Sequence, residues 1–170
     1  MKILKYILLL SLFFSFLSAN EILLLHSYNK GLKWSDGISD GVEEVMKKHP
    51  NFELTTQYMD SKKVESEQYS DELLKLYEKK FSHQKYDVII AADNYAYEFA
   101  LQYHEHLFKK VPIVFCGVEN FQQTSIPKKA KPYVTGVVEY KDIRKNLELI
   151  YALFPAIKMV YIISDDAYSS

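Results

Sequence analysis

The stretch from Lys85 to Asn94 constrains the fold more than any other part of the sequence. Its apolar centre, Val88 to Ala92, is short and continuous, and the polar residues Asp93 and Asn94 follow it at once. Such a run is typical of a strand buried on both faces. Apolar side chains then recur at helical spacing from Tyr95 to Phe108, and Asp93 is a good N-cap for that helix. A buried parallel strand that leads into a helix is the unit from which α/β proteins build ligand sites.

Strand and helix patterns alternate along the first two thirds of the chain. The predicted strands are Glu21–His26, Phe52–Met59, Asp87–Ala92 and Val111–Cys116, and the predicted helices are Ser35–His49, Ser66–Phe81 and Asn94–Phe108. This alternation demands parallel pairing through right-handed crossovers. We therefore predict a three-layer α/β fold in which a parallel sheet of order 2-1-3-4 forms one Rossmann-like lobe.

The composition of the sequence changes at residue 122. Gln, Thr, Ser, Pro and Lys dominate the following residues, so we predict a connection over residues 122–133. A strand pattern at Tyr133–Glu139, a helix pattern at Asp142–Phe154 and a strand pattern at Met159–Ile163 come next. These patterns predict an amino-terminal lobe over residues 20–121 and the start of a second α/β lobe over residues 134–170. A complete second lobe needs roughly another hundred residues, so we expect a fragment or a truncated product.

Residues 1–19 have the pattern of a secretory signal peptide. A basic segment, Met1–Lys5, precedes an apolar segment, Tyr6–Leu17, and cleavage is expected after Ala19. The alternative is an uncleaved membrane anchor at the N-terminus, although the apolar run is short for a span, which needs about 20 residues. We expect a periplasmic protein. Its only cysteine, Cys116, leaves no intramolecular disulfide.

Charge and composition restrict the classes of ligand that this chain is expected to bind. The net charge of −1 gives no electrostatic footprint for nucleic acid. The single arginine, Arg144, argues against a phosphate or dicarboxylate ligand, because forked recognition of such groups usually uses arginine. The aromatic content of 15% indicates either stacking surfaces for a ligand with a flat part or a codon bias toward Lys, Tyr and Phe.

Polar, aromatic and glycine residues follow the predicted strands at their carboxyl ends. These ends share one edge of a parallel sheet, where helix N-termini also offer free N–H groups. We predict a ligand cleft there, lined by His26, Ser27, Tyr28, Trp34, Asp60, Asp93, Asn94, Tyr95, Gly117, Glu119 and Asn120, with Thr135 and Gly136 at the crossover between lobes. The alternative is that these residues only cap helices and satisfy loops. For Trp34, stacking on a ligand and packing beneath the first loop are equally compatible with its position.

Five segments together resemble a known family: Ile22–Tyr28, Trp34–Ile38, Tyr58–Asp60, Asp87–Asn94 and Pro112–Phe121. They look like the extracytoplasmic sensor domains of bacterial histidine kinases and diguanylate cyclases. Those domains are similar to the substrate-binding proteins of ABC transporters, which have the periplasmic binding protein type I fold. The resemblance covers residues 21–166 and implies two α/β lobes, a hinge, and a ligand held between the lobes.

An enzyme is the opposing hypothesis. Cys116 at a strand end, with His26 on a neighbouring strand, suggests a thiol nucleophile, which needs a lowered pKa. A buried cysteine that packs as a small apolar residue is the commoner case. His104 and His106 face different directions on a helix, and the sequence has no phosphate-loop or zinc spacing. We therefore predict no catalytic role, no cofactor and no metal.

These observations predict an exported domain that binds a small molecule, such as an amino acid or an aromatic compound. It is expected to act either as the sensory domain of a membrane signalling protein or as the substrate-binding protein of an ABC transporter. Its partner is accordingly a signalling module or a membrane permease. Ligand contacts would act by favouring closure of the two lobes. The alternatives are a small α/β hydrolase that uses Cys116 or His26, and a truncated fragment without function.

Overall fold

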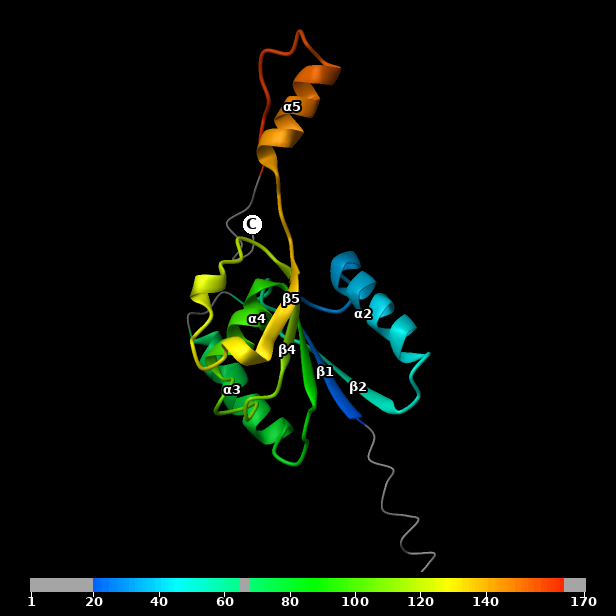
Figure 1. The fold of residues 1–170 in the computed structure, drawn as a ribbon, viewed down its shortest axis with the longest axis vertical. Helices are drawn as coiled ribbons and strands as arrows, with labels where there is room; N and C mark the ends of the chain where they lie inside the picture. Colours follow the sequence, from blue (N-terminus) through cyan, green and yellow to red (C-terminus); the bar gives the residue numbers. More distant parts are fainter. Residues whose placement is uncertain (1–19, 65–67, 164–170) are drawn as a thin grey trace, which may run out of the picture.

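A five-stranded, fully parallel sheet organises the chain (Figure 1). The computed structural model describes residues 20–64 and 68–163, so the predicted signal peptide lies outside the described residues. The strands are β1 (Asn20–His26), β2 (Phe52–Tyr58), β3 (Val88–Ala92), β4 (Ile113–Val118) and β5 (Val134–Val138). Their order in the sheet is β2-β1-β3-β4-β5. The predicted order 2-1-3-4 is confirmed, with β5 added beside β4.

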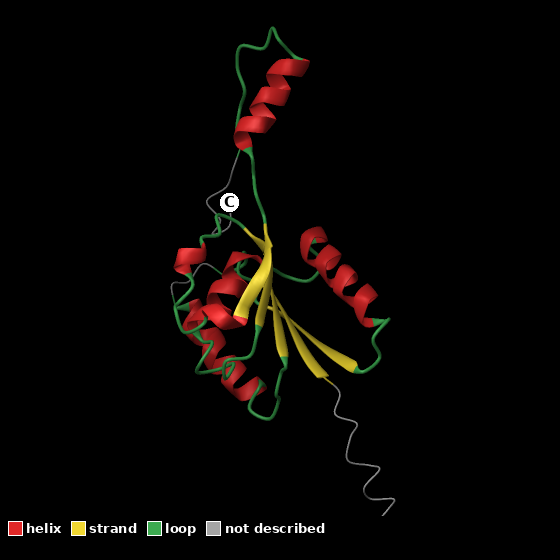
Figure 2. Ribbon diagram, viewed as in Figure 1, coloured by secondary structure: helices red, strands yellow, loops and turns green. Residues whose placement is uncertain are grey.

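Helices flank the sheet on both faces, which confirms the three-layer α/β class (Figure 2). The helices are α2 (Lys33–Met46), α3 (Tyr69–Lys80), α4 (Asp93–Gln102) and α5 (Ile143–Leu153). Two short 3-10 turns, Gln123–Ser125 and Lys131–Tyr133, lie between β4 and β5. Helices α3 and α4 cover one face, and α2 lies over the other (Figure 1). No helix in the described part of the chain is long and apolar enough to cross a membrane.

The core lies between the sheet and helices α3 and α4. The strand residues that face it are Leu23, Leu25, Ile89, Ala91, Ile113 and Phe115. Aromatic side chains from the two helices fill the space above them: Tyr77 stacks on Phe81 with ring centroids 4.9 Å apart and meets the edge of Phe99 at 5.7 Å. Such pairs add to the stability gained from area burial alone. Much of the aromatic content of the sequence is therefore used in packing.

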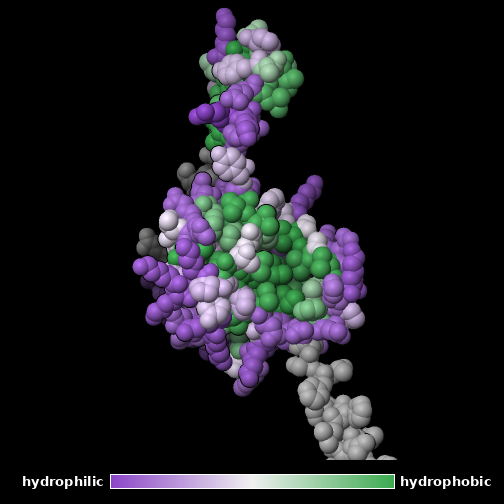
Figure 3. Space-filling view, in the orientation of Figure 1, coloured by the Kyte–Doolittle hydropathy of each residue, from purple (hydrophilic) through white to green (hydrophobic). Residues whose placement is uncertain are grey.

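The opposite face of the sheet is only partly covered. The registers pair Leu24 with Ile90 and Ile90 with Val114, so these three side chains share this face. Leu24 is fully buried near α2, whereas Ile90 and Val114 are half-buried and Val137 on β5 is 72% exposed. Figure 3 shows hydrophobic side chains gathered in a hollow beside α2. The cover over this face therefore decreases from β1 toward β5.

Strand β5 differs from its predicted place. Residues 134–138, expected to open a second lobe, hydrogen-bond to β4 and extend the first sheet. Helix α5 then projects away from the sheet (Figure 1), and none of its residues is buried. The division of the chain into two lobes stays a prediction.

The predicted strand Met159–Ile163 is wrong, because these residues adopt no regular structure and Ile163 is 95% exposed. A strand needs a neighbouring strand to pair with its N–H and C=O groups, and no strand of the described chain lies against residues 159–163. The third predicted helix is also shorter than expected: α4 ends at Gln102 rather than at Phe108. The segment after it turns through two residues with positive φ, Lys109 at 50° and Lys110 at 66°.

Candidate functional site

The register of the sheet brings several predicted site residues to one edge. His26 pairs with Ala92 and Ala92 pairs with Cys116, so the chain leaves β1, β3 and β4 at nearly the same level. Ser27, the start of α4 and Gly117, which directly precedes the last β4 residue, Val118, lie at this level. We call this the carboxyl edge of the sheet.

Ser27, the residue after β1, fixes the start of α4. Its hydroxyl donates a hydrogen bond to the Ala92 carbonyl at 2.8 Å and accepts one from the Ala96 N–H at 2.8 Å. The residue at the N-cap position of α4 is Ala92, and Asp93 is the first residue of the helix. The prediction that Asp93 caps this helix is therefore wrong, because the Ser27 hydroxyl, directly after β1, already satisfies the N–H group that a cap would take.

Asp93 has a strained backbone conformation and a buried side chain. Its φ is +71°, in the left-handed region, and its side chain is only 3% exposed. Oδ1 accepts a hydrogen bond from the Trp34 indole N–H at 2.7 Å, while Oδ2 has no hydrogen-bond partner among the described residues. Burial raises the pKa of the Asp93 carboxyl to about 6, against the opposing effect of the Trp34 hydrogen bond. The negative charge of Glu139 also raises this pKa.

Gly117 makes room for the pair formed by Asp93 and Trp34. Its φ is +66°, and a Cβ there would lie 2.8 Å from Asp93 Oδ1 and 3.3 Å from Trp34 Cζ2. Only glycine adopts this backbone conformation freely and leaves that space open. Trp34 is 46% exposed although its N–H is bonded, so one part of the ring packs on the edge and another part faces outward.

Asn94 ties the loop after β4 to the start of α4. Its side-chain amide donates to the Glu119 carbonyl at 3.2 Å, and its Oδ1 accepts from the Glu119 N–H at 2.9 Å. The Glu119 carboxylate forms an ion pair with Lys141. Beside this loop lies a cavity of about 440 Å³, lined in part by Glu119, Asn120, Val138, Glu139, Tyr140 and Lys141. The two hydrogen bonds of Asn94 therefore fix the position of Glu119, which lines this cavity.

The comparisons with known proteins identify the family. A family model described as ABC transporter substrate binding protein matches residues 27–170. The chain belongs to this family. No curated protein and no solved structure matches it. Membership gives this substrate-binding protein a ligand-binding role, in a family that is typically extracytoplasmic, typically non-enzymatic and typically partnered by a permease.

His26 lies beneath the surface of this substrate-binding domain. The ring is fully buried, its Nε2 lies 2.9 Å from the Ser39 hydroxyl, and it stacks on Tyr58 with ring centroids 4.9 Å apart. Burial lowers the pKa of His26 to about 4, so the ring is neutral near pH 7. Its Nδ1 has no hydrogen-bond partner among the described residues. His26 therefore holds α2 against the sheet through its hydrogen bond to Ser39.

The remaining predicted site residues are spread around the edge. Tyr28 is buried, with Lys62 Nζ 4.7 Å from its ring centroid, and Asp60, with φ +53°, pairs with Lys63 at 3.3 Å. Tyr95 is half-buried, and its ring centroid lies 6.2 Å from that of Tyr69. Asn120 is exposed, with φ +52°.

Thr135 and Gly136 belong to the body of β5. A Cβ at Gly136 would lie 2.3 Å from the Phe115 carbonyl oxygen, so this glycine permits close packing of β5 on β4. Glu139, which was not among the predicted site residues, follows the carboxyl end of β5 as the other candidates follow their strands. Its charge acts on Asp93, and it would have been found if β5 had been assigned to the same sheet.

The chemistry of Cys116 argues against the thiol hypothesis. Burial raises the pKa of this thiol to about 11, and the negative charge of Asp93 acts in the same direction. A nucleophilic cysteine needs the opposite shift. The His26 ring is hydrogen-bonded to the Ser39 hydroxyl, not to the thiol. Among the described residues, no group of three His, Cys, Asp or Glu side chains is placed to hold a metal ion.

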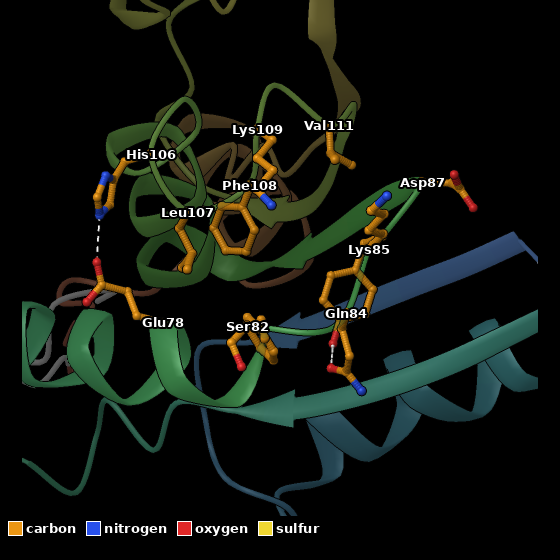
Figure 4. A pocket seen from close by; sticks show the side chains of 12 residues that line it. Glu78, Ser82, Gln84, Lys85, Asp87, His106, Leu107, Phe108, Lys109 and Val111 are labelled. Atoms are coloured by element: carbon orange, nitrogen blue, oxygen red, sulfur yellow. Dashed lines mark hydrogen bonds and ion pairs between the residues drawn. The ribbon is translucent and has the colours of Figure 1, made fainter.

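A second cavity, of about 450 Å³, opens at the opposite, amino edge of the sheet (Figure 4). Its apolar lining residues are Phe81, Tyr86, Leu107, Phe108 and Val111. Its polar rim contains an ion pair between His106 Nε2 and Glu78 Oε1 at 2.6 Å, and Asp87, which accepts a hydrogen bond from the Glu21 N–H at 2.9 Å. None of the residues predicted to bind a ligand lines this cavity.

Proposed function

We propose that this chain is the ligand-binding part of an exported protein, which takes up a small molecule at the carboxyl edge of its sheet. It would either deliver that molecule to a membrane permease or report it as the sensory domain of a signalling protein. The family supports the ligand-binding role, and its typical permease partner favours transport. The basic and apolar pattern of residues 1–19 favours export.

The observation that carries the choice of edge is the concentration of unsatisfied polar atoms. Buried polar atoms in proteins are nearly always hydrogen-bonded, and exceptions need an explanation. At the carboxyl edge, His26 Nδ1, Ser35 Oγ and Asp93 Oδ2 are buried and have no partner in the described part of the chain; the other two such atoms there are the hydroxyls of Tyr77 and Tyr97 in the aromatic core. The three atoms at the carboxyl edge come from three separate elements, β1, α2 and α4. A polar ligand or ordered water that enters this edge would supply the missing hydrogen bonds.

Lobe closure is the mechanism that this placement favours. A ligand that contacts the carboxyl edge on one side and the segment after β5 on the other would stabilise the closed arrangement over the open one. The cavity beside Glu119 already lies between the loop after β4 and the connection to α5. Ligand contacts there would link the sheet to the projecting α5, whose residues are not buried.

A thermal-shift screen of the full chain tests the site. Amino acids, sugars, organic acids, amines and aromatic compounds are added separately, and a ligand that binds the folded state raises the melting temperature by mass action. We expect Trp34→Ala to abolish the shift of any true ligand. Leu32→Ala, an exposed apolar neighbour before α2, is the matched control and should leave the shift unchanged. Shifts that survive Trp34→Ala but vanish on a change in the amino-edge cavity would contradict the proposal.

Export and output need separate experiments. A reporter that is active only outside the cytoplasm, fused to the full chain, should lose its activity when residues 1–19 are deleted. Finding an equally active reporter without these residues would contradict export by this segment. A permease gene beside the coding sequence would favour transport, and a membrane-spanning signalling module in the same reading frame would favour sensing.

A further inference from the structure

We propose, on the basis of the ligand-binding role above, that the carboxyl edge selects an organic amine: a ligand that carries a protonated amino group beside a flat apolar part and lacks a carboxylate. The ammonium group would bind Asp93 Oδ2, and the apolar part would lie against the Trp34 indole. This class is narrower than that of amino acids, which carry a carboxylate as well.

The Asp93 carboxylate is available because the fold does not use it fully. Ser27 performs the capping that an acidic residue at this position would normally provide. Trp34 occupies Oδ1 alone, and Oδ2 is buried without a partner in the described chain. An unpaired carboxylate oxygen in a strained, buried position costs stability and persists where it serves a function. An ammonium group would supply the missing charge-assisted hydrogen bond.

The charges around Asp93 favour a cation and disfavour an anion. Glu119 and Glu139 are close enough to raise its pKa, and Lys62 is the positive charge that lowers it. Lys62 lies over the Tyr28 ring, and Lys141 is paired with Glu119. These contacts occupy both lysines, so a ligand carboxylate would meet repulsion from Asp93 and Glu139.

Trp34 provides the apolar and aromatic surface. Tryptophan is the best aromatic partner for a cation, and this indole lies beside a carboxylate and above Gly117. Because Oδ2 is buried, an entering ammonium must move a neighbouring side chain. The indole, which is nearly half exposed, is the neighbour that can swing outward. Its movement would leave the ring free to cover the bound ligand.

Four matched probes test the inference by calorimetry on the full chain near neutral pH: 2-phenylethylamine, 2-phenylethanol, 3-phenylpropanoate and phenylalanine. We expect 2-phenylethylamine to bind at least about tenfold more tightly than each of the others. Asp93→Asn should remove that preference, and Glu139→Gln should weaken it only a few-fold. The affinity for the amine should fall as the pH drops below about 6, where the Asp93 carboxyl is protonated. Glu78→Gln, at the amino edge, is the matched control and should change nothing.

Other results separate this inference from the broader proposal. If 3-phenylpropanoate or phenylalanine binds best, and Trp34→Ala abolishes that binding while Asp93→Asn does not, the carboxyl edge binds ligands but does not select amines. If none of the four binds, the amine inference is wrong, and the wider screen still tests the site. If the amine binds equally to wild type, Asp93→Asn and Trp34→Ala, both proposals are wrong for this edge. Melting curves show that each variant is folded before its binding is compared.

Discussion

The two edges of the sheet carry cavities of nearly equal volume, about 440 Å³ and 450 Å³, and differ in their chemistry. At the amino edge the polar side chains pair with one another, as His106 does with Glu78, around an aromatic floor that belongs to the core. At the carboxyl edge three buried polar atoms lack partners among the described residues. Cavity volume therefore does not distinguish the two edges. The buried polar atoms without hydrogen-bond partners distinguish the two edges, and they indicate that a ligand is expected at the carboxyl edge.

The largest expected effect tests whether the amino edge is core. Phe108 is only 4% exposed, and its ring centroid lies 6.3 Å from that of Phe99. Phe108→Ala should lower the free energy of unfolding by about 3 to 5 kcal/mol, through lost burial and the enlarged cavity. Denaturant titration measures this loss. Lys85→Ala, at an exposed position of the same rim, should change stability by less than about 0.5 kcal/mol.

If Phe108→Ala leaves the protein folded but removes ligand binding, the distinction between the two edges fails. A loss below about 1 kcal/mol would show that the floor of this cavity is not part of the cooperative core.

The next prediction concerns Gly117, which supports the carboxyl edge. Gly117→Ala should cost about 2 to 3 kcal/mol, because it adds backbone strain at φ +66° and a clash with Asp93 Oδ1. Gly31→Ala is the matched control: its φ is +89°, but no atom lies within 4 Å of the added Cβ, so only the strain of about 1 kcal/mol applies. Equal losses in the two variants would show that Asp93 and Trp34 do not pack on Gly117. The measurement is again denaturant unfolding.

The sequence predicted the frame of the carboxyl edge better than its contacts. Alternating strand and helix patterns are local signals, and they correctly placed β1, β3 and β4 side by side. The sheet membership of β5 was missed, because a composition break precedes it and because the hydrogen-bond partner of a strand is not a local property.

Asp93 shows why the contacts of the site could not be predicted. The local rule for helix caps favoured Asp93, but the hydroxyl of Ser27, 69 residues before the Ala96 N–H that it accepts from, performs the capping. Likewise, the Trp34 indole reaches Asp93 across 59 residues of sequence. Both contacts depend on how far each strand runs before its loop begins, which hydrophobic patterns set only within a few residues. The sequence is enough to single out Asp93 as a candidate, whereas its contacts depend on the three-dimensional arrangement.

Asp93→Asn should stabilise the protein. The folded carboxyl has a pKa of about 6 against an ordinary value of 3.8, so its charged form is disfavoured by folding. Near neutral pH the variant should gain about 2 kcal/mol, because the amide keeps the acceptor for Trp34 and removes a buried charge. The gain should shrink as the pH falls from about 6 to 3.8, where the wild-type carboxyl becomes neutral. Unfolding titrations at several pH values measure it. A loss of stability at neutral pH would show that the charge is paired in the folded protein.

The smallest expected effect is the pH dependence of the wild-type protein, because two groups at the same edge oppose each other. Unfolded His26 takes up a proton before the folded ring does, so its contribution to stability falls as the pH drops from 6.5 to about 4. The folded Asp93 carboxyl takes up its proton first, so its contribution rises as the pH drops from about 6 to 3.8. The two shifts are similar in size, and together they should change stability by less than about 1 kcal/mol across this range. In Asp93→Asn the His26 contribution acts alone, so as the pH falls from about 6 to 3.8 the variant should lose about 2 kcal/mol more stability than wild type. Parallel pH profiles for the two proteins would show that the pKa shift of Asp93 is absent, because the His26 contribution is common to both.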